Sequence, residues 1–162
     1  MELTFVPSGI VQIDNARLIW KNFEGRKSRF NQAGDRDFSV VIPSQEQADM
    51  LLNDVNKYGV GWNVRIRAPR EEGETPLMTL KVKIGNFNER GPFIYLVSGQ
   101  NKVRLTEDTV QCLDTMDIRY VNMDIRPYDG EGAQGPFRSA YLHAMEVYQN
   151  VNRFEPRFTE EY

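Results

Sequence analysis

Apolar and polar residues alternate along about seven segments of this 162-residue chain, and this period of two is its strongest constraint on the fold. In 78–84, Met, Leu, Val and Ile alternate with Thr and two Lys, so one face of the segment is apolar and the other is charged. Such segments are expected to form strands that bury one face. The predicted strands are 11–21, 38–42, 62–68, 78–84, 93–97, 118–126 and 138–151. The first changes phase at Asp14 and Asn15, which predicts a bulge or bend.

Two helices are predicted among these strands. Ser44 and Gln47 have the spacing of a capping box and precede apolar residues on one helical face, which predicts a helix over about 44–58. A short second helix is predicted over about 106–114, after an N-cap threonine. Most connections are short enough for antiparallel strands. We therefore predict a mainly β (α+β) fold, a five-stranded antiparallel barrel of the oligonucleotide-binding (OB) type with added strands and an inserted helix. A mixed β-sandwich is the alternative.

The length and composition are those of one soluble domain. We predict that this domain covers 1–152, that 153–162 is a short flexible tail, and that glycine and proline make 127–137 the most flexible internal segment. The sequence shows neither a signal-peptide pattern nor an apolar stretch long enough to span a membrane, which predicts a cytoplasmic protein without membrane contact. The single cysteine, Cys112, cannot form an internal disulfide or a cysteine-built zinc site.

The segment between the first two predicted strands combines basic and aromatic side chains. From position 20 to 36 it holds five cations and two anions. Proteins that bind single-stranded nucleic acid need cations for the phosphates and flat rings on which bases stack, so this segment is the leading candidate site. The candidates are Lys21, Arg26, Lys27, Arg29 and Arg36 for phosphates, and Phe23 and Phe30 for stacking. Trp20 and Trp62 share the parity of aliphatic neighbours and are expected in the core.

Two later strands each carry a pair of cations opposite an apolar face. The pairs are Arg65 with Arg67, and Lys81 with Lys83. If the two strands are neighbours, the four like charges would repel one another unless an anion lies between them. We therefore predict that these residues extend the nucleic-acid groove; a solvated charged face is the structural alternative. The net charge of -3 requires any basic surface to be local.

The sequence contains no recognised catalytic or cofactor-binding motif. His143 lies among alternating apolar residues and is expected to be a structural strand residue rather than a general base. Asp114, Asp117 and Asp124 are conceivable metal ligands, but the first two lie at a predicted helix end, where acids are common. We predict a protein that is not an enzyme and needs no cofactor or metal. The alternatives are a protein-interaction or virion structural module on a β-sandwich and a metal-dependent nuclease.

Several phrases of the sequence resemble the single-stranded DNA-binding proteins encoded by tailed bacteriophages. They are ARLIWKNF at 16–23, FSVVIP at 38–43, GWNVRIRAP at 61–69, LDTMDI at 113–118 and IRPYDGEGAQGPFRSAYLHAMEV at 125–147. The resemblance implies an OB barrel that coats and protects single-stranded DNA, with tolerance of sequence, in phage replication, recombination or repair in the host cytoplasm. It also implies contacts of the tail 153–162 with replication or recombination proteins. RNA stays open as a second ligand.

Overall fold

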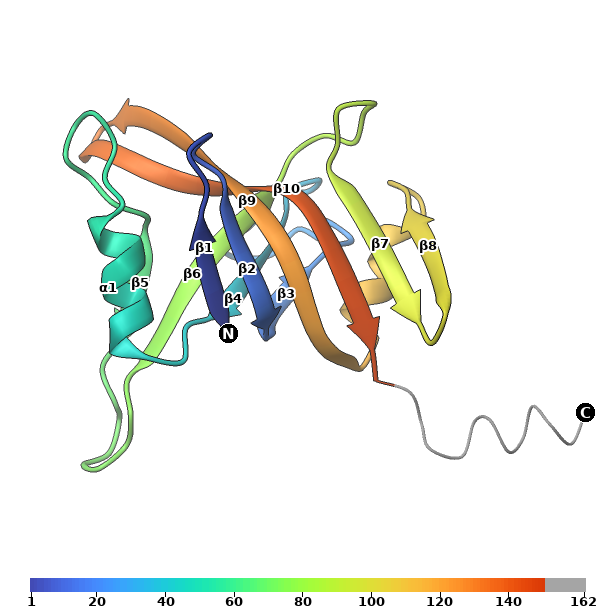
Figure 1. Ribbon diagram of the computed structural model, residues 1–162, viewed down its shortest axis with the longest axis horizontal. Coiled ribbons are helices and arrows are strands. Elements are labelled where there is room, and N and C mark those ends of the chain that lie inside the picture. The colour runs from blue at the N-terminus through green and yellow to red at the C-terminus, as the bar shows by residue number, and fades with distance from the viewer. Residues whose placement is uncertain (151–162) are drawn as a thin grey trace, which may run out of the picture.

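The computed structural model describes residues 1–150, which form ten strands, one α-helix and one 3-10 helix (Figure 1). In chain order these are β1 (Glu2–Phe5), β2 (Val11–Ala16), β3 (Leu18–Asn22), β4 (Arg36–Val41), α1 (Gln45–Asn53), β5 (Val64–Arg67), β6 (Leu77–Ile84), β7 (Phe93–Ser98), β8 (Asn101–Leu105), η1 (Val110–Asp114), β9 (Ile118–Gly132) and β10 (Gly135–Gln149). The predicted domain boundary at 152 and the predicted tail lie outside the described residues.

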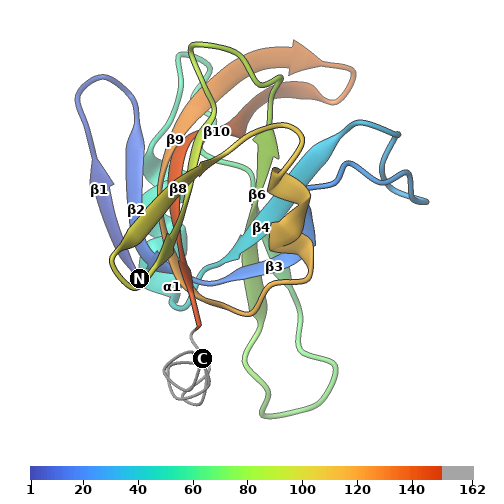
Figure 2. The same cartoon turned by 90° about the vertical axis from the view of Figure 1, so that its right-hand side faces the viewer.

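The strands form a small barrel in which β2 and β3 act as one bent strand. Only Arg17 separates them; β2 pairs with β9, and β3 pairs with β4. From β4 the sheet continues through β6 and β10 back to β9, so it returns on itself (Figure 2). Asn15 has a φ of 54° and lies at the register shift in β2, which confirms the predicted bend. The OB-like barrel is thus confirmed, except that β10 pairs with β6 in parallel rather than antiparallel.

The barrel interior is filled by the apolar faces that the alternating pattern predicts. On β6 the side chains of Met78, Leu80, Val82 and Ile84 are buried, whereas Lys83 is exposed. The facing strands β2, β4, β9 and β10 contribute valine, isoleucine, leucine, methionine and phenylalanine to the same core. Removing this apolar surface from water is the main stabilising contribution, at about 25 cal/mol per Å².

Helix α1 packs beside β5 and is shorter than predicted. The Ser44 side chain accepts a hydrogen bond from the backbone N–H of Gln47 at 3.2 Å, which confirms the N-cap. The helix ends at Asn53 because the chain turns back and the N–H of Trp62 donates to the Leu51 carbonyl. The second predicted helix is only the 3-10 turn η1.

The glycine- and proline-rich segment 127–137, predicted to be the most flexible internal loop, is instead strand. It forms the far end of the β9–β10 hairpin, in continuous register from Tyr141 opposite Arg126 to Gly135 opposite Gly132. Glycine is needed here for packing, because a Cβ on Gly130 would lie 2.8 Å from the Phe137 ring. The two arms of the hairpin run across the molecule in Figure 1 and form its longest element.

Besides β5, which pairs with β6, three further strands extend the barrel. The unpredicted β1 pairs antiparallel with β2 at one edge. The β7–β8 hairpin attaches to the second half of β10 through a parallel β7–β10 pairing, and β8 forms an edge strand beyond it. Within the described residues no helix is long and apolar enough to cross a membrane.

Candidate nucleic-acid interface

The loop between β3 and β4 is held in place by residues that were predicted from the sequence to bind nucleic acid. Phe23 is fully buried and stacks on Phe38 with ring centroids 5.4 Å apart, so its prediction as a base-stacking residue is wrong. Its N–H donates to the Asp114 carboxylate at 2.7 Å, and the N–H of Glu24 donates to the same group. Asp114 therefore anchors the start of the loop to η1. The polar and apolar pattern of the loop sequence alone does not predict this contact.

Two predicted phosphate-binding cations also have structural partners. Lys21 donates from Nζ to the carbonyls of Leu113 at 2.8 Å and Met116 at 3.1 Å. Arg36 donates from Nε to the Phe23 carbonyl at 2.9 Å, and its guanidinium lies 5.4 Å from the centroid of the Phe87 ring. We therefore assign both cations mainly to the attachment of the loop, although Arg36 also lines the groove described below.

The tip of this loop presents the remaining candidates to solvent. Phe30 is 88% exposed, and the Arg29 guanidinium lies 5.9 Å from its ring centroid. Arg26 pairs with Glu24 at 3.4 Å, and Lys27 is exposed. An exposed ring among three cations is the arrangement that the sequence predicted for single-strand binding.

A depression of about 550 Å³ lies between this loop and the outer face of the barrel. Its walls come from the loop, β4, β6 and β10, and they include Phe30, Arg36, Lys81, Lys83 and Tyr141. The Lys83 ammonium lies 6.0 Å from the Tyr141 ring centroid, since these residues are register partners of β6 and β10. Lys81 is partly neutralised by Asp37 at 3.5 Å. Four of the candidates that the sequence proposed, from segments far apart in the chain, thus line one depression.

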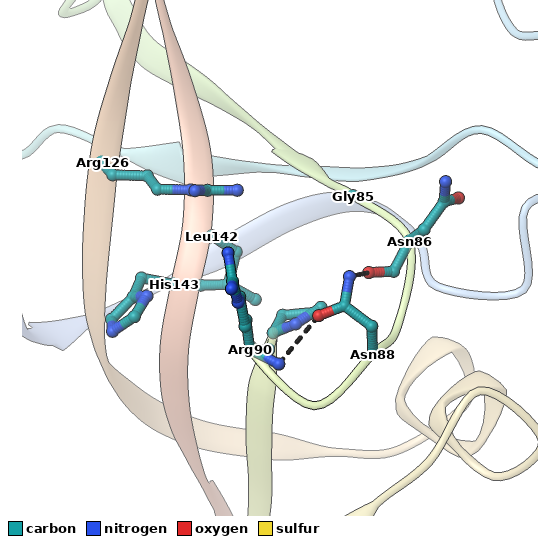
Figure 3. Close-up of a pocket in the computed structure, with 9 residues that line it drawn as sticks. Gly85, Asn86, Asn88, Arg90, Arg126, Leu142 and His143 are labelled. Atoms are coloured by element: carbon teal, nitrogen blue, oxygen red, sulfur yellow. Dashed lines mark hydrogen bonds between the residues drawn. The ribbon is translucent and has the colours of Figure 1, made fainter.

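A second depression of about 310 Å³ continues the first one, because Gly85 and Asn86 line both. It adds Arg90, Arg126 and His143, and Figure 3 shows these three side chains around one opening beside β10. Asn88 shapes the turn by accepting a hydrogen bond from the Arg90 N–H at 2.8 Å. We call the two depressions together the groove.

An aromatic series leads from the groove along the β9–β10 hairpin. The ring centroids of Tyr141 and Tyr128 are 5.9 Å apart, and those of Tyr128 and Phe137 are 6.2 Å apart. Tyr128 is 58% exposed. The series was missed because a loop was predicted over 127–137. Arg126 lies in the predicted strand 118–126, and its place on the polar face of that strand was the available signal.

The cation pair of β5 lies away from the groove. Strands β5 and β6 are neighbours, which is the condition for the predicted common groove. However, Arg65 is opposite Thr79 and Arg67 is opposite Leu77. At roughly 3.3 Å per residue, these positions are about 13 and 20 Å along β6 from Lys83. The four cations therefore form a line rather than a cluster, and only the lysines reach the groove.

The two tryptophans differ from each other. Trp62 is buried as predicted, and its indole N–H donates to Asp54 at 2.9 Å. Trp20 is 58% exposed and has a φ of 52°, so its prediction as a core residue is wrong. The left-handed residue reverses the alternation that pattern analysis assumes, and it lies within the register irregularity of β3.

An acidic area borders the basic groove on β2, β9 and β10. Asp14, Asp124 and Glu146 line one depression there. Burial raises the pKa of Asp124, while the nearby His143 acts in the opposite direction. Within residues 1–150 no group of acidic, histidine or cysteine side chains is arranged to hold a metal ion, and Asp114 serves the loop anchor. This arrangement gives no support to the nuclease alternative.

Comparison with known proteins identifies the family. The model of the family described as "Putative phage ssDNA-binding domain" matches residues 3–160. The chain belongs to this family. Single-stranded DNA binding, predicted from the loop and from the short phrases, is thereby confirmed as the function of the domain. No curated protein sequence matches the chain.

Solved structures with the same fold include a single-stranded DNA-binding protein from bacteriophage Enc34, at 13% identity and a TM-score of 0.57, covering 94% of this chain and 87% of that one. The same phage protein in complex with single-stranded DNA gives 13% identity, a TM-score of 0.56, and coverage of 94% and 93%. A C-terminal truncation of it gives 12% identity, a TM-score of 0.52, and coverage of 93% and 91%. At these identities the matches show a shared fold.

Proposed function

We propose that single-stranded DNA lies in the groove, between the loop tip and the turn that carries Arg90. Lys83, Arg90 and Arg126 contact phosphates, and bases stack on Phe30 and Tyr141. The observation that carries this assignment is the single depression lined by an exposed loop phenylalanine, two β6 lysines and a β10 tyrosine. The loop cations Arg26, Lys27 and Arg29 add phosphate contacts at one end. Tyr128 extends the stacking surface along the hairpin.

The groove is specific for single strands in its chemistry. Stacking requires bases whose faces are free, and each stacked base contributes about 1–3 kcal/mol with little dependence on its identity. The phosphate contacts are equally indifferent to sequence. A protein built in this way coats a single strand and protects it, which fits a role in phage replication or recombination in the host cytoplasm. Phosphates and free base faces are common to DNA and RNA, so we propose RNA as a second ligand of the same groove.

A paired set of double variants tests the location of the site. Lys83→Ala with Arg126→Ala removes two groove cations, whereas Arg65→Ala with Arg67→Ala removes the same charge from the exposed strand β5. In a fluorescence titration with labelled oligo-dT at low salt, we expect the groove variant to bind about tenfold or more weakly. The affinity of the β5 variant for oligo-dT should stay close to that of the unmodified protein.

Equal losses in both double variants would contradict the groove and support the wider set of cations that the sequence suggested. Thermal unfolding of both variants is the control for folding, because a destabilised variant would lose affinity for another reason. We also propose that the domain acts without catalysis and that 153–162 contacts replication or recombination proteins. A labelled strand incubated with magnesium or manganese, followed by electrophoresis, tests the first of these statements.

A further inference from the structure

The β7–β8 hairpin carries two cations stacked over two aromatic rings on one face. The Arg104 guanidinium lies 4.9 Å from the Phe93 ring centroid, and the Lys102 ammonium lies 4.6 Å from that of Tyr95. Arg104 is the register partner of Tyr95, so all four side chains share a face of the hairpin. We call these four residues the hairpin track. Both cations are exposed, whereas the two rings are half-buried beneath them.

The hairpin track begins where the groove ends. Gly91 and Pro92 line the second depression and lead directly into Phe93. The Phe93 ring meets the His143 ring edge-on at 6.0 Å, and His143 lines the same depression. In the parallel pairing, Phe93 lies opposite Ala144 on β10, on the face that carries Asp124 and Glu146 rather than the core. The groove and the hairpin track are therefore parts of one continuous outer surface.

Charge around the track limits the path of a polyanion. Asp14, Asp124 and Glu146 line one depression together with Tyr95 and Lys102 of the hairpin track, and Glu146 is 3.6 Å from Lys102. A phosphate backbone leaving the groove is repelled by these carboxylates and attracted by the two cations of β8. The favourable route thus follows β7 and β8. The same carboxylates form a boundary along the other side of that route.

We propose that the hairpin track is a second binding segment for single-stranded DNA, engaged only by strands long enough to pass out of the groove. It rests on the proposed function of the groove. Arg104 offers a flat guanidinium on which a base can stack while its N–H groups reach a phosphate, and Lys102 contacts the next phosphate. Lys102 already forms an ion pair with Glu146, so its contact with a phosphate must replace that pair. The phosphate contact of Lys102 therefore contributes less to DNA affinity than the contact of Arg104.

The length of the strand separates the two parts of the site. Oligo-dT of increasing length, from about 4 to about 30 nucleotides, is titrated against the full chain and against Lys102→Ala with Arg104→Ala. We expect unchanged affinity for the shortest strands that bind and a loss of about tenfold for the longest. The slope of log affinity against log salt should fall by about 1.4 for long strands only, the value for two phosphate contacts on a single strand. Arg65→Ala with Arg67→Ala is the matched control for charge.

Three outcomes would overturn the inference: an unchanged affinity of the variant at every length, an equal loss at every length, or an equal loss in the β5 control. Arg104→Lys distinguishes stacking from charge alone, because it keeps the charge and removes the planar group. These results are distinct from failure of the groove itself, which would appear as weak binding of short strands by the unmodified protein.

Photocrosslinking tests the hairpin track in the unmodified protein, so its result does not depend on whether a variant folds. After irradiation with a long oligo-dT, peptide mass spectrometry should find cross-links at Phe93 or Tyr95 as well as at Tyr141. With a strand that fills only the groove, the cross-links at 93 and 95 should disappear. Cross-links confined to the groove with long strands would contradict the hairpin track.

Discussion

Two phenylalanines seven positions apart show how much a residue's role depends on tertiary contacts. Phe23 and Phe30 both lie in polar, basic sequence, and both were predicted to stack on bases. Phe23 is buried against Phe38 because Asp114 and Lys21 tie the start of the loop to η1. Neither tie has a signal in the local sequence, since Asp114 is about 90 positions away. Exposure of Phe30 follows from its place at the tip of the loop.

Replacement of each phenylalanine by alanine should separate these roles. Phe23→Ala should lower the free energy of unfolding by about 3–5 kcal/mol, the cost of removing a buried aromatic ring. Phe30→Ala should leave stability unchanged and weaken oligo-dT binding by about 1–3 kcal/mol, about 5- to 150-fold. Urea unfolding and fluorescence titration give the two quantities. A Phe30→Ala variant with full affinity would remove the loop tip from the binding site.

At the scale of elements, the sequence predicts the strands in which apolar and polar residues alternate. It does not predict the end of the β9–β10 hairpin, where glycine and proline lie in strands rather than in turns. Strand β9 follows the period of two closely over 118–126, whereas β4 and β6 follow it in sequence but also bury the polar residues Ser39 and Thr79. The end of the β9–β10 hairpin was misassigned because glycine and proline normally indicate turns. Here Gly130 gives room for the Phe137 ring. The groove was predictable only in part, since its position depends on the parallel register of β6 and β10.

Arg138 joins the β9–β10 hairpin to the end of α1, and the Asn56 side chain adds hydrogen bonds to Asp129 and to the Phe137 carbonyl. Arg138 donates to both carboxylate oxygens of Asp129, from Nε at 2.9 Å, and to the Asp54 carbonyl at 2.9 Å. The hydrogen bond from Arg138 holds the pKa of Asp129 below its usual value. Because the unfolded chain then binds more protons than the folded one in acid, this contact stabilises the fold at neutral pH.

The contribution of Asp129 should be lost as the pH falls through its lowered pKa, below about 4. Asp129→Asn should therefore be less stable than the unmodified protein at neutral pH, and the difference should shrink on acidification. Urea unfolding at several pH values measures it, with Glu131→Gln, an exposed acid on the same strand, as the control. A difference that is independent of pH would show that the carboxylate charge is not the cause.

At the scale of the whole molecule, a net charge of -3 coexists with a basic groove. The acidic area on β2, β9 and β10 and the cations of the loop, β6 and β9 occupy different parts of the surface. Attraction of DNA is therefore local to the basic surfaces, and the acidic area repels it. An overall count of charge in the sequence could not show this separation.

Binding should weaken steeply with salt despite the negative net charge. Three to six phosphate contacts on a single strand give a slope of about -2 to -4 for log affinity against log salt. Titration of the full chain with oligo-dT in a series of sodium chloride concentrations measures the slope. A slope near zero would mean that stacking alone supports binding and that the groove cations make no phosphate contacts.

Strand β10 pairs with β9, β6 and β7, and therefore joins the barrel to its added hairpin. Its parallel partners lie some 50 positions earlier in the chain, and β2 must also wait for β9. During synthesis, the earlier strands remain an open sheet with unpaired edges until residues 135–149 emerge. Contacts of such long sequence separation make for slow folding. Closure of the barrel is thus the last step of its formation, and the groove exists only after the step is complete.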